Sequence, residues 1–440
     1  MEQNYEEKRE ARRKRRRRNQ TLAYLTVIIL IAVMAVGIVF GVQELKKIAG
    51  QQEETQQSQQ EKVEELLATE ESIEVPAPTP TVVELTPEQK LDEIVNAGIE
   101  VMPLEDKVAG LFIVTPEAIT GVSTAIQAGE GTQEALAKYA VGGLVYFEKN
   151  IQSESQIKLM LENTQLYTKY PLFIAVDEEG GEVSRIAKAG LAEKVDGAQT
   201  IGATGDANNA YQAGTAIGTY LSGLGFNLDF APVADLANVE KSVMEKRSYG
   251  ADAATVAGFV NSMMQGLEEQ NVTACLKHFP GIGSSTEDTH KGLASTDRSK
   301  EDFQANEFAV FRAGIEAGAD MIMVSHMAAP SLAGDNTPSS LSSEVVTNIL
   351  RNELNFKGVI ITDALNMSAI SEYYSSEQAA VMALRAGCDM VLMPENFEEA
   401  YQGVLKAVQE GTISEERIND SLRRIYRIKY ADKIEETEAE

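Results

Sequence analysis

Eight short apolar runs alternate with helix-compatible segments between residues 89 and 432, and this alternation predicts an α/β fold of the (β/α)8 TIM-barrel type. Most of the runs are continuously apolar, which is typical of strands buried on both faces of a parallel sheet. An open doubly wound sheet is the alternative. No G-x-G-x-x-G motif follows the first run, so nothing indicates a dinucleotide site.

The predicted strands are the runs GLFIV, GGLVYF, PLFIAVD, FNLDFAPV, TACLKHF, MIMVSH, KGVIITDAL and CDMVLMP, which begin at Gly110, Gly142, Pro171, Phe226, Thr273, Met321, Lys357 and Cys388. Helices are expected between them, at residues 154–167, 208–224, 253–270 and 343–352. A final helix over 415–429 closes the predicted domain, and a short acidic tail follows at 433–440.

The chain before the barrel divides into a basic tail (1–20), an apolar stretch (21–42) and a Gln- and Glu-rich stalk (43–88). Residues 22–42 carry no charge, and as a helix they would span roughly 32 Å, about one bilayer core. The basic run before them should stay in the cytoplasm, which places the later residues outside. We therefore expect a single-pass protein of the cell membrane, with the predicted barrel at 89–432 outside the cell. A cleaved signal peptide is the alternative, although the apolar stretch is longer than a typical h-region.

Composition excludes several classes of partner. The formal net charge is −28 even with the basic tail included, which argues against nucleic acid, whose binding requires neutralised phosphates. Both cysteines, Cys275 and Cys388, lie inside predicted strands and are interpreted as small core residues. No H-x-x-x-H or C-x-x-C spacing indicates a metal, and we expect no cofactor.

Residues 275–293, CLKHFPGIGSSTEDTHKGL, hold the densest group of chemically useful side chains. A predicted strand ends there in Lys277 and His278, and a glycine-hinged loop then carries Asp288 and His290. Barrel enzymes place functional groups at the carboxyl ends of their strands. The other predicted strands and the loops after them supply Asp177, Arg185, Asp229, Asp235, Arg247, His326 and Asp363. Asp229 lies within its strand and is the best candidate for a purely structural role.

This inventory suits cleavage of a glycosidic bond. Asp363 is a candidate nucleophile for an anomeric carbon, and His290 with Asp288 beside it is a candidate proton donor. An imidazole titrates near pH 6.5, and a flanking carboxylate can fix its tautomer. Imidazole is neutral once it has given up its proton, so an anionic acceptor such as phosphate would not be repelled. Phosphorolysis therefore stays open beside hydrolysis.

Residues 91–427 resemble the β-N-acetylhexosaminidases of glycoside hydrolase family 3. The motifs that carry this resemblance are KHFPGIGSSTEDTHKGL, VDEEGGEVSRI, NLDFAPVADL, EKRSYG and PSSLSSEVVTNILRNELNFKGVIITDALNM. Three positions depart from the commonest pattern of that family: Glu178 stands where Gln is usual, Glu182 where Arg is usual, and Ile282 where His is usual. These departures concern loop packing and the preference for the aglycone.

The resemblance implies an exo-acting, retaining β-N-acetylglucosaminidase. Asp363 would form a glycosyl-enzyme, His290 oriented by Asp288 would be the general acid/base, and the ligands of the terminal sugar would be Asp177, Arg185, Arg247, Lys277 and His278. With the predicted anchor, the expected substrates are N-acetylglucosamine-containing glycans such as peptidoglycan fragments. Alternatives are an N-acetylglucosaminide phosphorylase, a β-glucosidase of the same family, and a non-catalytic wall-binding module.

Overall fold

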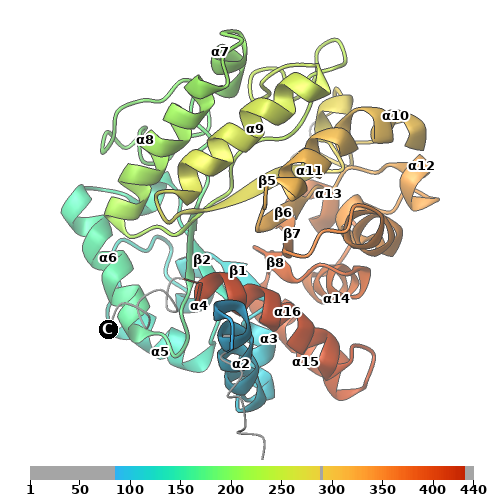
Figure 1. The fold of residues 1–440 in the computed structure, drawn as a ribbon. Helices are drawn as coiled ribbons and strands as arrows, with labels where there is room; N and C mark the ends of the chain where they lie inside the picture. The colour runs from blue at the N-terminus through green and yellow to red at the C-terminus, as the bar shows by residue number, and fades with distance from the viewer. Residues whose placement is uncertain (1–84, 288–290, 432–440) are drawn as a thin grey trace, which may run out of the picture. The chain divides into compact units, whose positions relative to one another are not determined.

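The computed structural model describes residues 85–287 and 291–431, which belong to one compact unit of the chain, Glu84–Glu440. Eight parallel strands close into a barrel in chain order, and the last strand pairs back with the first (Figure 1). The strands are β1 (Phe112–Val114), β2 (Gly143–Val145), β3 (Phe173–Val176), β4 (Leu228–Asp229), β5 (Thr273–Phe279), β6 (Met321–Val324), β7 (Val359–Ala364) and β8 (Met390–Leu392). Each lies within one of the eight predicted runs, so the predicted barrel is confirmed.

Helices surround the barrel (Figure 1). The α-helices are α2 (Pro87–Glu100), α3 (Leu104–Ala109), α4 (Pro116–Thr120), α5 (Glu130–Lys138), α6 (Glu154–Tyr167), α7 (Ala198–Gly202), α8 (Asn208–Leu224), α9 (Ala253–Glu268), α10 (Lys300–Ala305), α11 (Glu307–Glu316), α12 (Pro330–Ala333), α13 (Ser368–Ser371), α14 (Ser376–Ala386), α15 (Phe397–Gln409) and α16 (Glu415–Lys429). The other helical segments are the 3-10 turns η1 (Glu148–Asn150), η2 (Ile282–Ser284) and η3 (Ser339–Leu341) and the π-helix η4 (Glu344–Glu353). The predicted bounds of α6, α8 and α16 are confirmed, α9 ends two residues earlier than predicted, and η4 is shifted by one residue.

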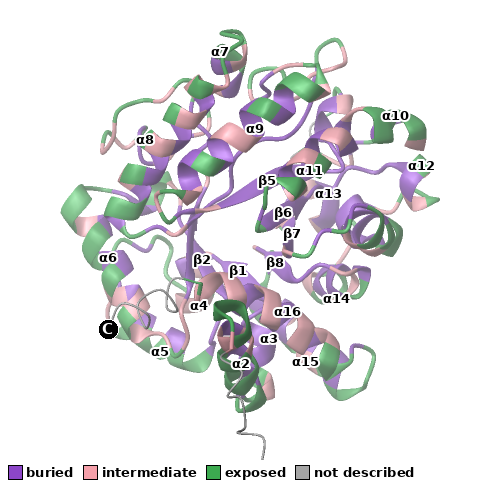
Figure 2. Cartoon of the chain, viewed as in Figure 1, coloured by how far each residue is buried: buried purple, intermediate pink, exposed green. Residues whose placement is uncertain are grey.

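The strands are buried while the helices expose one side, as Figure 2 shows. Helices α8 and α9 approach each other closely because glycines face the contact: a Cβ on Gly214 would lie 2.3 Å from the Met263 carbonyl oxygen. Leu221 and Ile217 of α8 and Val260 of α9 are fully buried. The continuous apolar runs and the apolar helix stripes therefore form one core around the barrel.

Helix α2 begins at a capping box, in which the Thr86 side chain and Gln89 bond each other's backbone amides. The basic tail, the apolar stretch 21–42, nearly all of the predicted stalk and the tail at 433–440 lie outside the described residues. No helix between residues 85 and 431, as far as the structure describes them, is long and apolar enough to cross a bilayer.

A buried carboxylate, Asp389, fastens the end of the chain to the barrel. It accepts hydrogen bonds from Arg351 of η4 at 2.5 Å, from Ser421 of α16 at 2.7 Å and from Arg424 of α16 at 3.0 Å. The backbone N–H of Ile360 in β7 also donates to it, at 2.9 Å. One fully buried charge thus holds η4, α16 and β7 together just before β8.

We expect Asp389→Asn to destabilise the fold by about 3 kcal/mol, because it leaves largely buried guanidinium groups without their counter-charge. The measurement is the shift in the urea midpoint of the full chain. Glu416→Gln is the matched control, since its pair with Arg423 (2.7 Å) is exposed and should contribute less than about 1 kcal/mol. Equal effects of the two substitutions would contradict the structural role of Asp389.

Candidate active site

The predicted site residues that the structure describes all lie toward the carboxyl ends of the barrel strands. Asp177 directly follows β3, Lys277 and His278 belong to β5, and Asp363 belongs to β7. Arg185 and Arg247 lie on the loops after β3 and β4. This is the end at which (β/α)8 enzymes carry their active sites. Asp288 and His290 lie outside the described residues.

Two irregularities in the barrel coincide with predicted site residues. The pairing of β5 with β6 shifts register between Lys277 and Phe279, and that of β7 with β8 shifts between Ile361 and Ala364. Such bulges re-aim side chains that regular alternation would send to opposite faces. His278 and Asp363 occupy these two interruptions, so the barrel departs from regular pairing where the sequence predicts chemistry.

Five charged side chains from the loop after β3, the loop after β4 and the end of β5 form an alternating array. Arg185 lies 3.5 Å from Asp177, whose other carboxylate oxygen accepts from the Lys277 ammonium at 2.8 Å. Lys277 also contacts Glu179 at 2.7 Å. Glu179 in turn binds Arg247 through both oxygens, at 2.8 Å to Nε and 2.6 Å to Nη2. The order of charge is therefore cation, anion, cation, anion, cation.

Neighbouring charges keep the centre of this array ionised. Lys277 and Arg247 hold the pKa of Glu179 well below its usual range, although burial alone would raise it. Asp177 and Glu179 raise the pKa of Lys277 against the opposing effect of burial. Lys277 is only 2% exposed, so its charge depends on these two carboxylates. Glu179 is consequently a poor candidate for a general acid.

His278 is oriented by a buried carboxylate, Asp235. The His278 Nδ1 lies 2.7 Å from Asp235 Oδ2, which also accepts from the His278 backbone N–H at 3.1 Å. The other oxygen of Asp235 accepts from the Ile282 backbone N–H at 2.7 Å. These contacts fix the orientation of the His278 ring and tie its backbone to the loop after β4. The sequence places Asp235 just after a predicted strand but does not reveal this pairing.

Glu178 holds the loop that carries Arg185. Its carboxylate accepts from the backbone N–H groups of Arg185 (2.5 Å), Ile186 (2.9 Å) and Ala187 (3.2 Å), and from the Tyr220 hydroxyl (3.0 Å). All four partners are donors, which suits a carboxylate. The Arg185 guanidinium also stacks over the Phe147 ring, 5.6 Å from its centroid. Phe147 was absent from the sequence prediction because nothing in its surroundings there marks it as a site residue.

The backbone of Glu178 contacts a second buried acid. Asp229, at the end of β4, accepts from the Glu178 backbone N–H at 2.9 Å. Burial raises the pKa of Asp229 well above its usual value. Asp229 therefore fastens β4 to the turn after β3, as a structural residue would.

The loop after β5 is anchored on both sides of residues 288–290. Before them, a Cβ on Gly283 would lie 1.9 Å from the Leu236 carbonyl oxygen, so only glycine fits there. After them, the Ser295 N–H donates to the Glu287 side chain at 3.2 Å, and the Thr296 N–H donates to the Ala328 carbonyl at 3.1 Å. The predicted acid/base pair thus lies on a segment whose two ends are attached to the loops after β4 and β6.

The remaining predicted residues have distinct surroundings. Asp363 accepts a hydrogen bond from the Ala364 backbone N–H at 2.8 Å, which helps to orient its carboxylate. His326 is fully buried, with Nδ1 2.8 Å from the Ser340 hydroxyl and Nε2 3.0 Å from the Ala364 carbonyl oxygen. His326 therefore links the ends of β6 and β7 and is poorly placed to exchange protons with a ligand.

The array retains hydrogen-bond donors beyond those that its carboxylates use. Lys277 has three donors and gives two of them to Asp177 and Glu179, while Arg185 Nε has no hydrogen-bond partner among the described residues. Fixed cations with donors to spare can bind several adjacent hydroxyl groups of one sugar. In residues 85–287 and 291–431, no three His, Cys, Asp or Glu side chains gather as metal ligands would.

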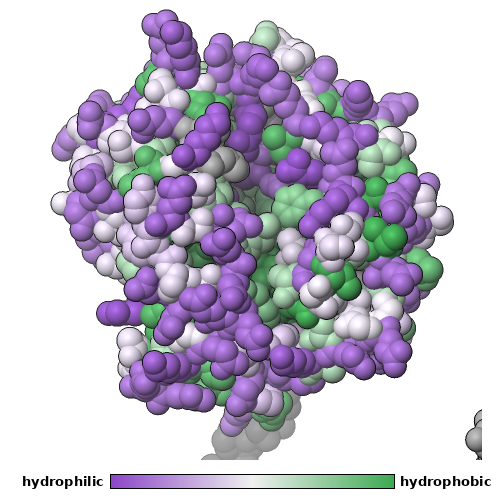
Figure 3. Space-filling model, turned by 180° about the vertical axis from the view of Figure 1, so that it is seen from behind, coloured by the Kyte–Doolittle hydropathy of each residue, from purple (hydrophilic) through white to green (hydrophobic). Residues whose placement is uncertain are grey.

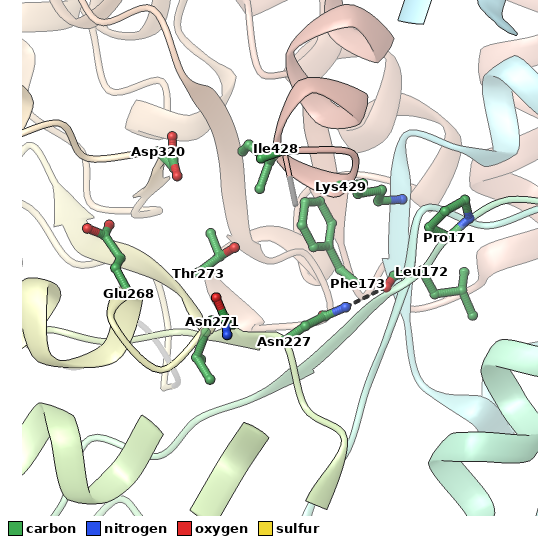
Figure 4. Close-up of a pocket in the computed structure, with 12 residues that line it drawn as sticks. Pro171, Leu172, Phe173, Asn227, Glu268, Asn271, Thr273, Asp320, Ile428 and Lys429 are labelled. Atoms are coloured by element: carbon green, nitrogen blue, oxygen red, sulfur yellow. Dashed lines mark hydrogen bonds between the residues drawn. The ribbon is translucent and has the colours of Figure 1, made fainter. Parts of the chain in front are cut away.

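A cavity of about 170 Å³ lies at the opposite end of the barrel. Figure 4 shows that Glu268 and Asp320 lie on one side of it and Lys429 on the other. Burial lowers the pKa of Lys429 to about 7, and burial together with the charge of Asp320 raises that of Glu268 to about 7. The cavity opens beside the amino ends of β3 and β5 and is lined by none of the predicted site residues. Figure 3 shows another view, in which one face is hollowed near its centre and largely hydrophilic around the rim.

An eight-stranded parallel barrel with an ionised cluster at the carboxyl ends of its strands defines the class of (β/α)8 enzymes. Residues 103–428 match the family described as Glycosyl hydrolase family 3 N terminal domain, and the chain belongs to that glycoside hydrolase family. The resemblance noted from the sequence motifs is confirmed at this level.

Several relatives in the family are hexosaminidases by name. Beta-hexosaminidase A of Pseudoalteromonas piscicida is 32% identical over 67% of this chain and 54% of its own length. The beta-hexosaminidase of Nitrosomonas eutropha is 34% identical over 59% of this chain and 76% of its own length. A solved family 3 beta-N-acetylglucosaminidase from Paenibacillus sp. str. FPU-7 is 33% identical, with a TM-score of 0.70 over 76% of this chain and 64% of that one. The chain thus spans about half the length of the first of these relatives.

Proposed function

We propose that this protein is an exo-acting, retaining β-N-acetylglucosaminidase that removes the non-reducing terminal N-acetylglucosamine from cell-wall fragments or related glycosides. The observation that carries the proposal is the alternating array of Arg185, Asp177, Lys277, Glu179 and Arg247. It presents fixed charge-assisted donors and acceptors at the barrel end, which suits the dense hydroxyl pattern of one terminal sugar. Relatives named as hexosaminidases support the choice of sugar.

The proposed reaction has two steps. The Asp363 carboxylate attacks the anomeric carbon, and the glycosidic bond breaks as His290 gives its proton to the leaving oxygen. Water then attacks the glycosyl-enzyme, His290 takes a proton from that water, and the bond to Asp363 breaks. Asp288 would hold the imidazole in the tautomer that exchanges this proton. Asp177, Arg185, Arg247, Lys277 and His278 would bind the sugar throughout.

The substrate is tested by comparing a chromogenic β-N-acetylglucosaminide with the matching β-glucoside, each with and without phosphate. We expect faster turnover of the N-acetylglucosaminide, with free N-acetylglucosamine as the product in both buffers. Preference for the glucoside would instead indicate a β-glucosidase. Formation of a sugar 1-phosphate in the presence of phosphate would indicate a phosphorylase. Binding of glycans without turnover of either substrate would indicate a non-catalytic wall-binding module.

The acid/base pair is tested with His290→Ala. This variant should slow substrates with poor leaving groups far more than activated aryl glycosides, because a good leaving group departs without a proton. Azide should restore part of the rate on activated substrates, since it attacks the glycosyl-enzyme without a general base. Asp288→Asn should show a milder form of the same pattern. If all substrates slow equally and azide has no effect, His290 is not the acid/base.

We also propose that residues 21–42 anchor the protein in the cell membrane, with 1–20 in the cytoplasm and the catalytic domain outside. The uncharged stretch behind a basic tail supports this topology. Protease added to intact cells should release a fragment that begins within residues 43–88. Protection of the whole chain until the cells are lysed would contradict the topology.

A further inference from the structure

Glu179 joins two barrel loops and the end of one strand. It lies on the loop after β3, its partner Arg247 on the loop after β4, and its partner Lys277 in β5. Both of its oxygens accept from Arg247, and one also contacts Lys277. It is 7% exposed, so water cannot easily replace either partner.

The two cations need this carboxylate because each disfavours the charge of the other. The pKa of Lys277 is raised by Asp177 and Glu179 but lowered by the nearby Arg247. Asp177 could still balance Lys277 without Glu179, but Arg247 would lose its only carboxylate hydrogen-bond partner among the described residues. Its guanidinium would then feel only the longer-range attraction of Asp235 and Asp177, with no carboxylate hydrogen bond to fix its position in the array.

We propose that Glu179 is a positioning residue that fixes the two sugar-binding cations, Lys277 and Arg247, at the separation which the terminal sugar requires. This inference rests on the proposed function, because the proposed sugar ligands are the groups that Glu179 holds. Glu179 itself has both oxygens occupied, so it acts through its partners rather than by contact with the substrate.

The loops after β3 and β4 also provide a matched control. Glu182 lies three residues after Glu179, and Lys246 directly precedes Arg247. These two side chains form an ion pair of 2.7 Å. The Glu182 and Lys246 side chains are 64% and 67% exposed, so their pair should contribute little. Both Glu179→Gln and Glu182→Gln replace a carboxylate that pairs with a cation on the loop after β4. The first substitution alters a buried pair and the second an exposed one.

Glu179→Gln should act specifically on binding. Its amide NH2 would face the donors of Arg247 or Lys277, and two donors cannot bond each other. Contacts to the sugar present in both the bound substrate and the transition state appear mainly in KM. We expect KM to rise about tenfold or more, which is the scale of a charge-assisted hydrogen bond, while kcat changes much less. Glu182→Gln should leave both constants within about twofold of the wild type.

The kinetics are measured on the full chain with whichever aryl β-glycoside, N-acetylglucosaminide or glucoside, the wild type turns over faster. A second readout needs no substrate: hydrogen exchange of the Arg247 Nε–H, followed by NMR. This proton should be protected in the wild type and in Glu182→Gln, and exposed in Glu179→Gln. A preference for the glucoside would contradict N-acetylglucosamine as the proposed sugar. The kinetics and the hydrogen exchange of the two variants could still be compared with those of the wild type. If neither glycoside is turned over, the exchange measurement decides alone.

The inference is overturned if Glu179→Gln lowers kcat with KM unchanged, or if the Arg247 Nε–H stays protected in that variant. Should Glu179→Gln fail to fold, Glu179→Asp takes its place. This variant keeps the charge but is one methylene shorter, so it cannot reach both cations at the distances now observed. It should raise KM less than Glu179→Gln would and partly expose the Arg247 Nε–H. A KM and a protection equal to those of the wild type would overturn the inference in this case too.

Discussion

The buried ammonium of Lys277 is the constraint on which the site depends. A charge with so little access to water is tolerated only when opposite charges surround it, and here Asp177 and Glu179 both contact it within 2.8 Å. Those two carboxylates lie on the loop after β3, so the position of that loop is tied to the end of β5. Glu179 then extends the tie to the loop after β4 through Arg247. Two barrel loops and the end of β5 are thereby held together by one network of ion pairs, and none of them can move without exposing an unpaired charge.

A second layer of acids holds this arrangement through backbone groups. Glu178 accepts from three successive amides of the Arg185 loop, and Asp235 accepts from the amides of His278 and Ile282. The departure at position 178, where the family usually has Gln, is compatible with this arrangement because every partner of that side chain is a donor. At position 282, where the family usually has His, this chain has a buried isoleucine. Its backbone N–H donates a hydrogen bond to Asp235. The chain therefore keeps the positions of the proposed sugar ligands while altering the residues behind them.

The barrel could be predicted from the sequence because strands buried on both faces are continuously apolar. Such runs can be recognised without any knowledge of tertiary contacts. Lys277, Asp177, Arg185 and Arg247 could be chosen because motifs and strand ends mark them. Glu179 could not be assigned a role in the same way. It follows Asp177 by two residues, and its partners are decided by the turn at Gly180 and Gly181, both with positive φ, which brings the Glu179 N–H to the Val183 carbonyl. The pairing of Asp235 with His278 likewise depends on the irregular register of β5 with β6, which no periodic pattern in the sequence encodes.

Burial and charge pairing also explain why the proposed sugar binding and the proposed proton transfer are assigned to different parts of the barrel end. The proposed sugar ligand Lys277 and its partner Glu179 are buried and paired with each other, and neighbouring charges keep both of them ionised. A group that exchanges protons near neutral pH needs a pKa near neutral, whereas Lys277 and Arg247 hold the pKa of the Glu179 carboxylate well below its usual range. His326 is also unsuited, because its ring nitrogens lie against Ser340 and the Ala364 carbonyl. The proposed acid/base pair lies outside the array, where the sequence supplies an imidazole and a carboxylate together on the loop after β5. That loop is anchored by Gly283 before residues 288–290 and by Ser295 and Thr296 after them.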